Sequence, residues 1–166
     1  MADSAKTDKK NKKTAKAKNK GRVAARIWAV QALYQMELAG APLEELIEEF
    51  ITHRLTTPLV DTKLPPADAA YFELIVRGVV AQQKQIDASI MRVLHKDWAL
   101  QKLDSTLRAL LRASVYELLY QSDIPSNALV SEYTNMAHAF FDMAEVGMVN
   151  ALLDRISKEK QSTHDT

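Results

Sequence analysis

The residues with the clearest chemical potential lie at the start of the chain. Residues 1–22 contain nine of the 22 lysines and arginines and only two of the 21 acids. The remaining residues hold 13 basic and 19 acidic side chains, so a strongly positive end is set against a negative remainder. This charge layout predicts that the N-terminal end binds a polyanion, and RNA is the first candidate.

Lysines and arginines could both contribute to binding a polyanion. A lysine-rich tail can also serve only as a solubilising segment. Flexible lysines neutralise phosphates without base specificity, whereas arginines held on a helix present planar forks. Arg22 and Arg26 are four residues apart, so they share a helix face, and the Gln31 amide could read a splayed base. The predicted RNA-binding residues are Lys16, Lys18, Lys20, Arg22, Arg26 and Gln31.

No pattern typical of a catalytic or metal site stands out. The chain has no cysteine, which excludes disulfides, thiolate nucleophiles and Cys-based metal sites. The four histidines are scattered along the chain, and none has a second metal-binding residue at ligand spacing: they are His53, His95, His138 and His164. The glutamates of residues 44–49 are typical of a solvated helix face, and no phosphate-binding glycine loop or Gly-flanked serine is present. We therefore expect no enzyme activity, no metal and no cofactor.

Length and composition favour one all-helical domain. A lysine-rich arm, residues 1–20, offers nothing apolar to offset the entropy of ordering and is expected to be disordered. A helical domain is expected over residues 21–160, followed by a flexible C-terminus over residues 161–166. The whole chain is 47% hydrophobic, and it contains few glycines and prolines that would break helices. No apolar run could span a membrane and no leader pattern is visible, which predicts a soluble, cytoplasmic protein with no membrane partner.

Apolar periodicity predicts about seven helices. The first begins near Gly21, carries Val23, Ile27, Val30 and Tyr34 on one stripe, and stops at Gly40. The clearest helix opens at Asp104, a good N-cap, and is expected at the centre of the core. The other helices are predicted over residues 43–55, from Pro66 to Lys84, from Ile86 to Leu94, from a cap at Ser126 onward, and around Val149–Ile156.

Several segments, taken in order, resemble the NusB family of transcription antitermination factors. The segments are Arg22–Tyr34, Tyr71–Val79, Leu103–Leu118, Asp123–Pro125 and Val149–Asp154. Each is weak alone because leucine-rich helices are common, but five in the same order make a specific match over about residues 22–157.

The resemblance implies a fold and a set of partners. The fold is an all-α bundle of two perpendicular three-helix subdomains with an extra helix. The role is non-enzymatic: family members pair with the small-subunit ribosomal protein NusE, bind single-stranded boxA RNA in nascent transcripts, and help RNA polymerase pass terminators, notably in ribosomal RNA operons. Some members self-associate, so a homodimer is possible. A partner surface is expected near Tyr116, Glu117 and Tyr120.

Two other functions remain open from the sequence. The chain could be an RNA-binding helical module of ribosomal RNA modification or ribosome assembly, without antitermination activity. It could also bind nucleic acid nonspecifically through its lysine arm alone.

Overall fold

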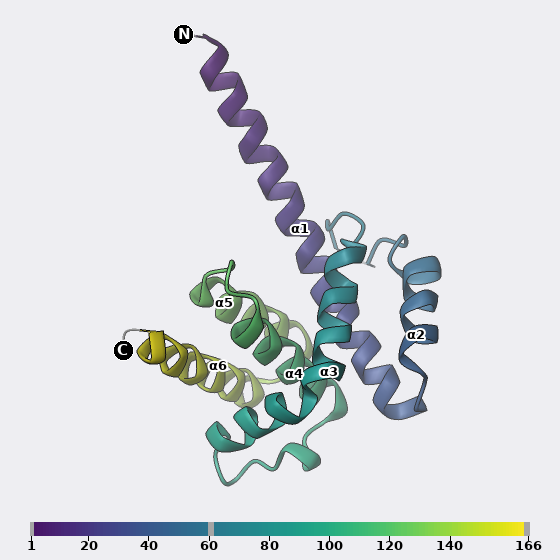
Figure 1. Ribbon diagram of the computed structural model, residues 1–166, viewed down its shortest axis with the longest axis vertical. Helices are drawn as coiled ribbons and strands as arrows, with labels where there is room; N and C mark the ends of the chain where they lie inside the picture. Colours follow the sequence, from purple (N-terminus) through teal and green to yellow (C-terminus); the bar gives the residue numbers. More distant parts are fainter. Residues whose placement is uncertain (1, 60–61, 165–166) are drawn as a thin grey trace.

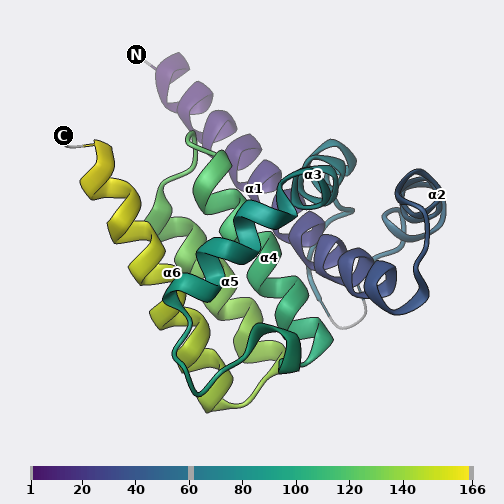
Figure 2. The same cartoon turned by 60° about the horizontal axis from the view of Figure 1, so that its bottom comes forward.

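The computed structural model describes residues 2–59 and 62–164, which fold into helices packed around one core (Figure 1, Figure 2). This described part contains six α-helices and no strand, which confirms the all-α class with one helix fewer than predicted. The α-helices are α1 (Ala2–Ala39), α2 (Leu43–Glu49), α3 (Ala69–Val93), α4 (Ser105–Tyr120), α5 (Ser126–Phe140) and α6 (Met143–His164). A π-helical turn, η1 (Phe50–Arg54), continues α2, and a 3-10 turn, η2 (Leu100–Lys102), precedes α4. Each described helix is too short or too polar to span a bilayer.

Helix α4 lies at the centre of the fold, as its apolar spacing predicts. It packs against α1 and α3 on one side and against α5 and α6 on the other. The Asp104 carboxylate accepts hydrogen bonds from the backbone N–H groups of Thr106 (2.9 Å) and Leu107 (3.4 Å), which confirms the predicted cap. Eleven of the 16 residues of α4 are buried and only Tyr120 is exposed, so the helices before and after it share one core.

Helix α3 is one continuous helix where the sequence predicts two. The polar run between Val80 and Ile86 contains no glycine or proline, and its lysine and glutamines are good helix formers. This run lies on the exposed face and therefore does not interrupt the helix. The Asp68 carboxylate caps the start by accepting from the Tyr71 N–H (3.0 Å), and the chain turns to extended backbone at Leu94.

The lysine arm differs from its expected disorder, because α1 runs without a break from Ala2 to Ala39 (Figure 1). Lysine and alanine have high helix propensity, and the arm contains neither glycine nor proline before Gly21. A packed helix already exists from Gly21 onward, so each arm residue extends it without a new nucleation cost. The helix ends where predicted, at Gly40, which adopts a φ of 63° that favours glycine.

The buried face of α1 is not the predicted stripe. Val30 is buried, but Val23, Ile27 and Tyr34 are only half-buried. The face that packs against α3 and α4 is rich in small residues, namely Ala25, Ala29 and Ala32, with Leu33 beside them. Alanines allow close approach of the neighbouring helices, so shape rather than side-chain hydrophobicity selects this face.

The C-terminal helices begin and end differently from the sequence prediction. Helix α5 starts at Ser126 itself, and the preceding Pro125 offers no side-chain cap, although the Asn127 Oδ1 accepts from the Ala128 N–H (3.0 Å) in the first turn. Helix α6 continues through most of the segment expected to be flexible and ends at His164, while residues 165–166 lie outside the described residues. Helices α5 and α6 pack against each other along their length.

The contact between α3 and α4 yields a stability prediction at Gly78. A Cβ at this position would overlap the Tyr116 ring, so Gly78→Ala should lower the free energy of unfolding by about 1–3 kcal/mol through overpacking. Gly147 lies on α6 with nothing within 4 Å of a Cβ, so Gly147→Ala should instead stabilise by up to about 1 kcal/mol. Urea unfolding of both variants tests this, and a neutral Gly78→Ala would contradict the close approach.

Candidate nucleic-acid interface

A buried ion pair joins α1 to α4. Arg26 is 2% exposed and Glu117 is fully buried. The Arg26 Nε donates to Glu117 Oε2 (2.8 Å) and its Nη2 donates to Oε1 (3.1 Å), so the pair is bidentate. Such geometry offsets part of the cost of burying two charges and fixes the relative position of the two helices.

Two tyrosines complete this pair. The hydroxyls of Tyr71 from α3 and Tyr133 from α5 both donate to the Glu117 carboxylate. Burial and the adjacent Glu117 charge raise the pKa of both tyrosines, so they remain neutral donors. Burial acts to lower the pKa of Arg26, but the hydrogen bond and charge of Glu117 outweigh it and raise the pKa. We call Arg26, Glu117, Tyr71 and Tyr133 the Arg26 network.

The Arg26 network corrects two sequence predictions. Arg26 is predicted as an exposed RNA contact, but its guanidinium is held inside the fold by Glu117. Glu117 is predicted on a partner surface, but its carboxylate accepts hydrogen bonds from Arg26, Tyr71 and Tyr133 and has no exposed surface. The expected exposure is wrong for both residues, because opposite charges on α1 and α4 neutralise each other in the core, whereas their roles in binding stay predictions.

Arg22 lies one turn before Arg26 at the edge of this network. Its guanidinium carbon lies 4.5 Å from the centroid of the Tyr71 ring, a cation–π contact. Among the described residues, neither the buried Nε of Arg22 nor the buried Nη1 of Arg26 has a hydrogen-bond partner. Arg22 is half-buried, so it retains access to a ligand that reaches the start of the packed part of α1.

A groove of about 480 Å³ lies between α1 and α5. We call it the α1–α5 groove. Its walls are mainly apolar and carry four polar side chains together with the edge of Arg26. The lining residues are Val23, Arg26, Ile27, Gln31, Leu59, Thr62, Glu132, Asn135, Met136, Ala139 and Phe140. Apolar walls with a few amide and carboxylate groups suit an unstacked base, whose faces pack and whose edges form hydrogen bonds.

The other predicted RNA residues lie along the same helix as the groove wall. Gln31 is exposed and lines the α1–α5 groove. Lys16, Lys18 and Lys20 are exposed on the projecting part of α1. Asn135 and Glu132 on α5 are groove residues that the sequence analysis missed, since no pattern in α5 indicates which helix it faces.

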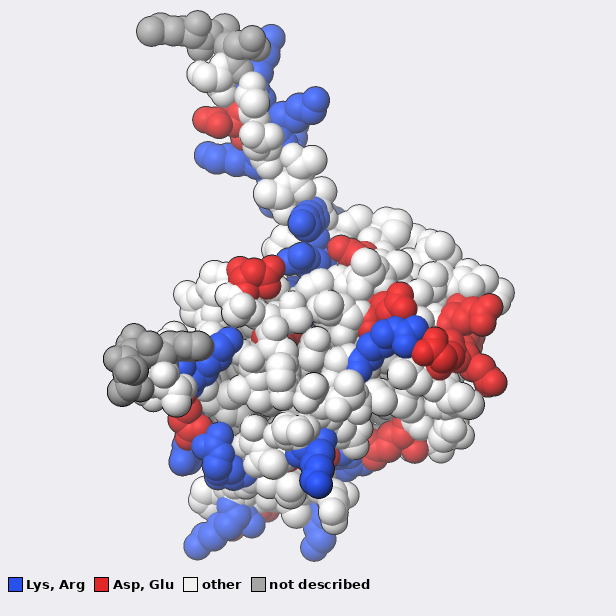
Figure 3. Space-filling view, viewed as in Figure 1, with Lys and Arg blue, Asp and Glu red and all other residues white. Residues whose placement is uncertain are grey.

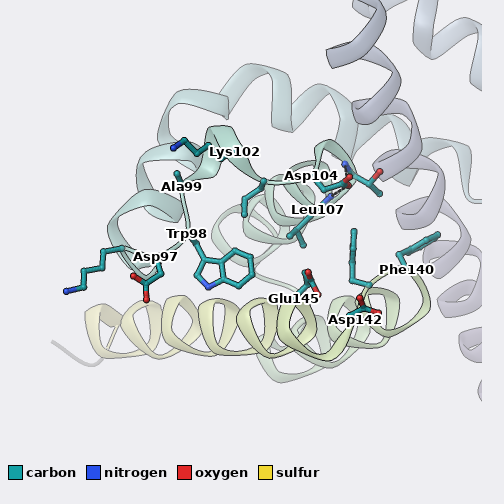
Figure 4. Close-up of a pocket in the computed structure, with 13 residues that line it drawn as sticks. Asp97, Trp98, Ala99, Lys102, Asp104, Leu107, Phe140, Asp142 and Glu145 are labelled. Atoms are coloured by element: carbon teal, nitrogen blue, oxygen red, sulfur yellow. Dashed lines mark hydrogen bonds between the residues drawn. The ribbon is translucent and has the colours of Figure 1, made fainter.

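A second and larger cavity, of about 750 Å³, lies between the turn before α4 and the α5–α6 connection (Figure 4). We call it the Trp98 pocket. Figure 4 shows Trp98 above α6, with Asp142 and Glu145 facing the same space. The lining contains four acids, Asp97, Asp104, Asp142 and Glu145, against two lysines, Lys96 and Lys102. This acidic surface with aromatic side chains suits a basic protein surface better than a phosphate backbone.

The predicted partner residues on α4 lie outside both cavities. Tyr116 is 7% exposed and its ring stacks on that of Tyr120, with 5.4 Å between centroids. Tyr120 is 40% exposed, so it is the one member of the predicted set of Tyr116, Glu117 and Tyr120 that offers substantial surface to a partner.

The surface charge follows the division seen in the sequence. Figure 3 shows basic side chains along the projecting part of α1, whereas acidic side chains gather on the body beside α2. Glu44 of α2 binds Arg77 of α3 at 2.6 Å there, so part of the acidic surface is already paired. Basic side chains also lie on the lower part of the body in this view, so the body carries both signs of charge, whereas the projecting part of α1 is mainly basic.

The Arg26 network yields a stability prediction. Arg26→Met leaves the Glu117 charge buried without a cation, and Glu117→Leu leaves the Arg26 charge alone, so each variant should lose about 3–5 kcal/mol. The double variant removes both charges and should lose less than the sum. Urea unfolding of all four proteins measures the coupling, and additive losses would contradict a cooperative pair.

The raised pKa values of Tyr71 and Tyr133 predict an alkaline dependence. Above the ordinary tyrosine pKa of 10.0, the unfolded chain loses protons that the folded chain keeps. The stability from these tyrosines is therefore complete below that pH and declines as the pH rises further toward the folded-state pKa values. Tyr133→Phe should show a shallower decline of unfolding free energy above pH 10 than the parent chain. Identical slopes would argue against the hydroxyl–carboxylate contact.

Comparisons with known proteins agree with this architecture. The family model described as "NusB family" matches residues 23–158. The chain is 48% identical over 149 residues to the transcription antitermination protein NusB of Rhizobium rhizogenes, covering 90% of this chain and 92% of that protein. It is 45% identical over 162 residues to NusB of Rhodopseudomonas palustris, covering 96% and 95%.

Solved structures show the same fold. A structure of T. maritima NusB superposes with a TM-score of 0.68 at 31% identity, covering 83% of this chain and 91% of that chain. A chain from a crystal structure of antitermination factors NusB and NusE in complex with dsRNA superposes with a TM-score of 0.67 at 21% identity, covering 86% and 97%. The family match spans most of the described helices and the relatives share nearly half of their residues with this chain, which belongs to the NusB family.

Proposed function

We propose that this chain is a transcription antitermination factor that binds boxA-type single-stranded RNA in nascent ribosomal RNA transcripts. The observation that carries the proposal is the placement of a basic helix directly before a mainly apolar groove with amide groups. The relatives named as antitermination proteins support the same role. The role is non-enzymatic, cytoplasmic and needs no cofactor.

The charge division supports capture of RNA from solution. Lysines on α1 attract phosphates over a distance comparable to the Debye length, while the acidic side chains near α2 repel a polyanion there. If about five phosphates are neutralised, the slope of log affinity against log salt is roughly −3.5 for a single strand. Attraction of this kind supplies affinity without sequence preference.

The α1–α5 groove supports base recognition. The amides of Gln31 and Asn135 offer both donors and acceptors, and the Glu132 carboxylate offers acceptors that suit the amino group of a base. Apolar side chains on both walls can pack against the faces of a base that has left its stack. Arg22 lies at the N-terminal end of this region and can contact the backbone of the same strand.

A protein partner completes the proposed mechanism. A structural neighbour was solved with NusE and dsRNA, and this supports a NusE-like ribosomal protein as the partner class here. The acidic and aromatic Trp98 pocket and the exposed Tyr120 are the surfaces offered to it. The joined proteins hold the transcript near RNA polymerase and so help it to pass terminators.

Replacement of Gln31 tests the base-reading groove. Gln31→Ala should weaken binding of a boxA-type RNA about tenfold, equal to about 1.4 kcal/mol, because it removes contacts to a base edge. Binding of a scrambled RNA of equal length should change little. Fluorescence anisotropy with labelled RNAs, with and without a NusE-like partner, measures both.

The matched control is Gln85→Ala, which removes an exposed glutamine from α3 outside the groove and should bind both RNAs like the parent chain. Equal losses for Gln31→Ala on both RNAs would reject base reading at this position. Failure of the parent chain to prefer boxA-type RNA would reject the function itself and favour nonspecific binding.

A further inference from the structure

The lysines of the projecting part of α1 are not distributed evenly around the helix. At about 100° per residue, six of them lie within a sector of about 120°, which is one face of the helix. They are Lys6, Lys9, Lys10, Lys13, Lys16 and Lys20. We call this row the lysine track. All six are exposed, and among the side chains of residues 4–59 and 62–163 none of the six forms an ion pair.

The remaining charges of the arm lie off this face. At about 100° per residue, Lys18 lies on the side opposite the track, and Asp8 lies outside its edge. Asp8, which is acidic, therefore does not interrupt the track. Lys12 is three residues after Lys9 and four before Lys16, so it borders the track, and Lys18 alone lies on the opposite side.

The face that carries the track continues into the α1–α5 groove. Val23, Ile27 and Gln31 follow Lys20 at intervals of three, seven and eleven residues, which keeps them on the same side of α1. All three line the α1–α5 groove. Because α1 is unbroken from Ala2 to Ala39, the track and the groove wall form one continuous surface.

We propose that the lysine track binds the phosphate backbone of single-stranded RNA that flanks the segment held in the α1–α5 groove. This inference rests on the proposed function and extends it, because it lengthens the RNA footprint and gives the arm a binding face. From Lys6 to Lys20 the track spans about 21 Å at 1.5 Å per residue. It lies before residue 23, where the match to the family model begins.

The rigidity of the track distinguishes it from a charged tail. A flexible tail brings any lysine to any phosphate, so the position of a lysine would not matter. A helix holds one row toward the RNA that enters the groove and turns Lys18 away. Lysine is suited to this task because its ammonium group contacts phosphates as a point charge without reading bases.

Two single variants with equal charge loss test the proposal. Lys13→Gln removes a lysine from the centre of the track, and Lys18→Gln removes one from the same segment on the opposite side of the helix. The sequence alone groups Lys18 with Lys16 and Lys20 as RNA contacts, whereas the track gives Lys18 no contact, so this pair separates the two predictions. Glutamine has a helix propensity close to that of lysine, so both variants should keep α1 helical, which circular dichroism checks. The full-length chains are titrated against two labelled RNAs that share a boxA-type core. One RNA carries flanks of about ten uridines, longer than the track at about 3.4 Å per nucleotide.

The expected result separates the two variants. On the flanked RNA, the on-track variant should bind about fivefold more weakly near 100 mM salt, and its salt slope should be shallower by about 0.7. The off-track variant should stay within about twofold of the parent, and on the core RNA alone both variants should bind like the parent.

Other outcomes would overturn the proposal in recognisable ways. Equal losses for both variants would show that charge alone matters, and no loss in either would show that the arm does not touch RNA. A stronger dependence on the track with duplex DNA than with RNA would assign it to a different ligand. If the parent chain still prefers the boxA core in these cases, only the track is rejected and the proposed function remains supported. If the parent chain shows no such preference, the proposed function itself is rejected.

Discussion

The position of α1 depends on a buried charge pair between helices that are far apart in sequence. Arg26 and Glu117 are separated by 91 residues and meet through two hydrogen bonds in the core. Farther along α1, Glu37 binds Arg108 and Arg112 near the start of α4. The two sets of contacts align α1 and α4 in opposite directions and prevent α1 from sliding or rotating. Every surface that α1 offers to a ligand therefore has a defined orientation.

The same constraint separates two kinds of surface. With α1 fixed, its half-buried apolar side chains meet α5 and form the walls of the α1–α5 groove. The Trp98 pocket lies on the other side of α5's C-terminal end, where α6 begins, and shares only Phe140 with the groove. Because the two sites are separate, the RNA strand and the protein partner of the proposed function can bind the molecule together. The acids around the Trp98 pocket disfavour a phosphate backbone there.

Local features were predictable from the sequence, because their causes are local. The cap at Asp104, the stop at Gly40 and the apolar face of α4 depend on residues within a few positions of each other. The burial of Arg26 was not predicted, because its partner Glu117 lies on another helix. One signal was available: Arg26 lies next to Ala25 on the alanine-rich side of α1 that continues through Ala29 and Leu33. Alanine carries little weight in a hydrophobic pattern, so the larger Val23 and Ile27 indicated the wrong face.

The candidate site was predictable only in part for the same reason. Gln31 and the lysines could be selected from α1 alone, and their role in RNA binding stays a prediction. The groove needs α5, and no pattern in Asn135 or Glu132 indicates that they face α1. The helical state of the arm was missed because composition was judged on residues 1–20 in isolation, without the packed helix that follows them.

The unbroken course of α1 through Gly21 also limits how the N-terminal segment can change length. Each inserted or deleted residue before Gly21 rotates everything upstream by about 100° about the helix axis. A change of seven residues nearly restores the original orientation, whereas a change of two turns the upstream lysines to the far side with no loss of charge. The angular phase of the segment, and not its lysine count alone, is therefore a quantity on which natural selection can act.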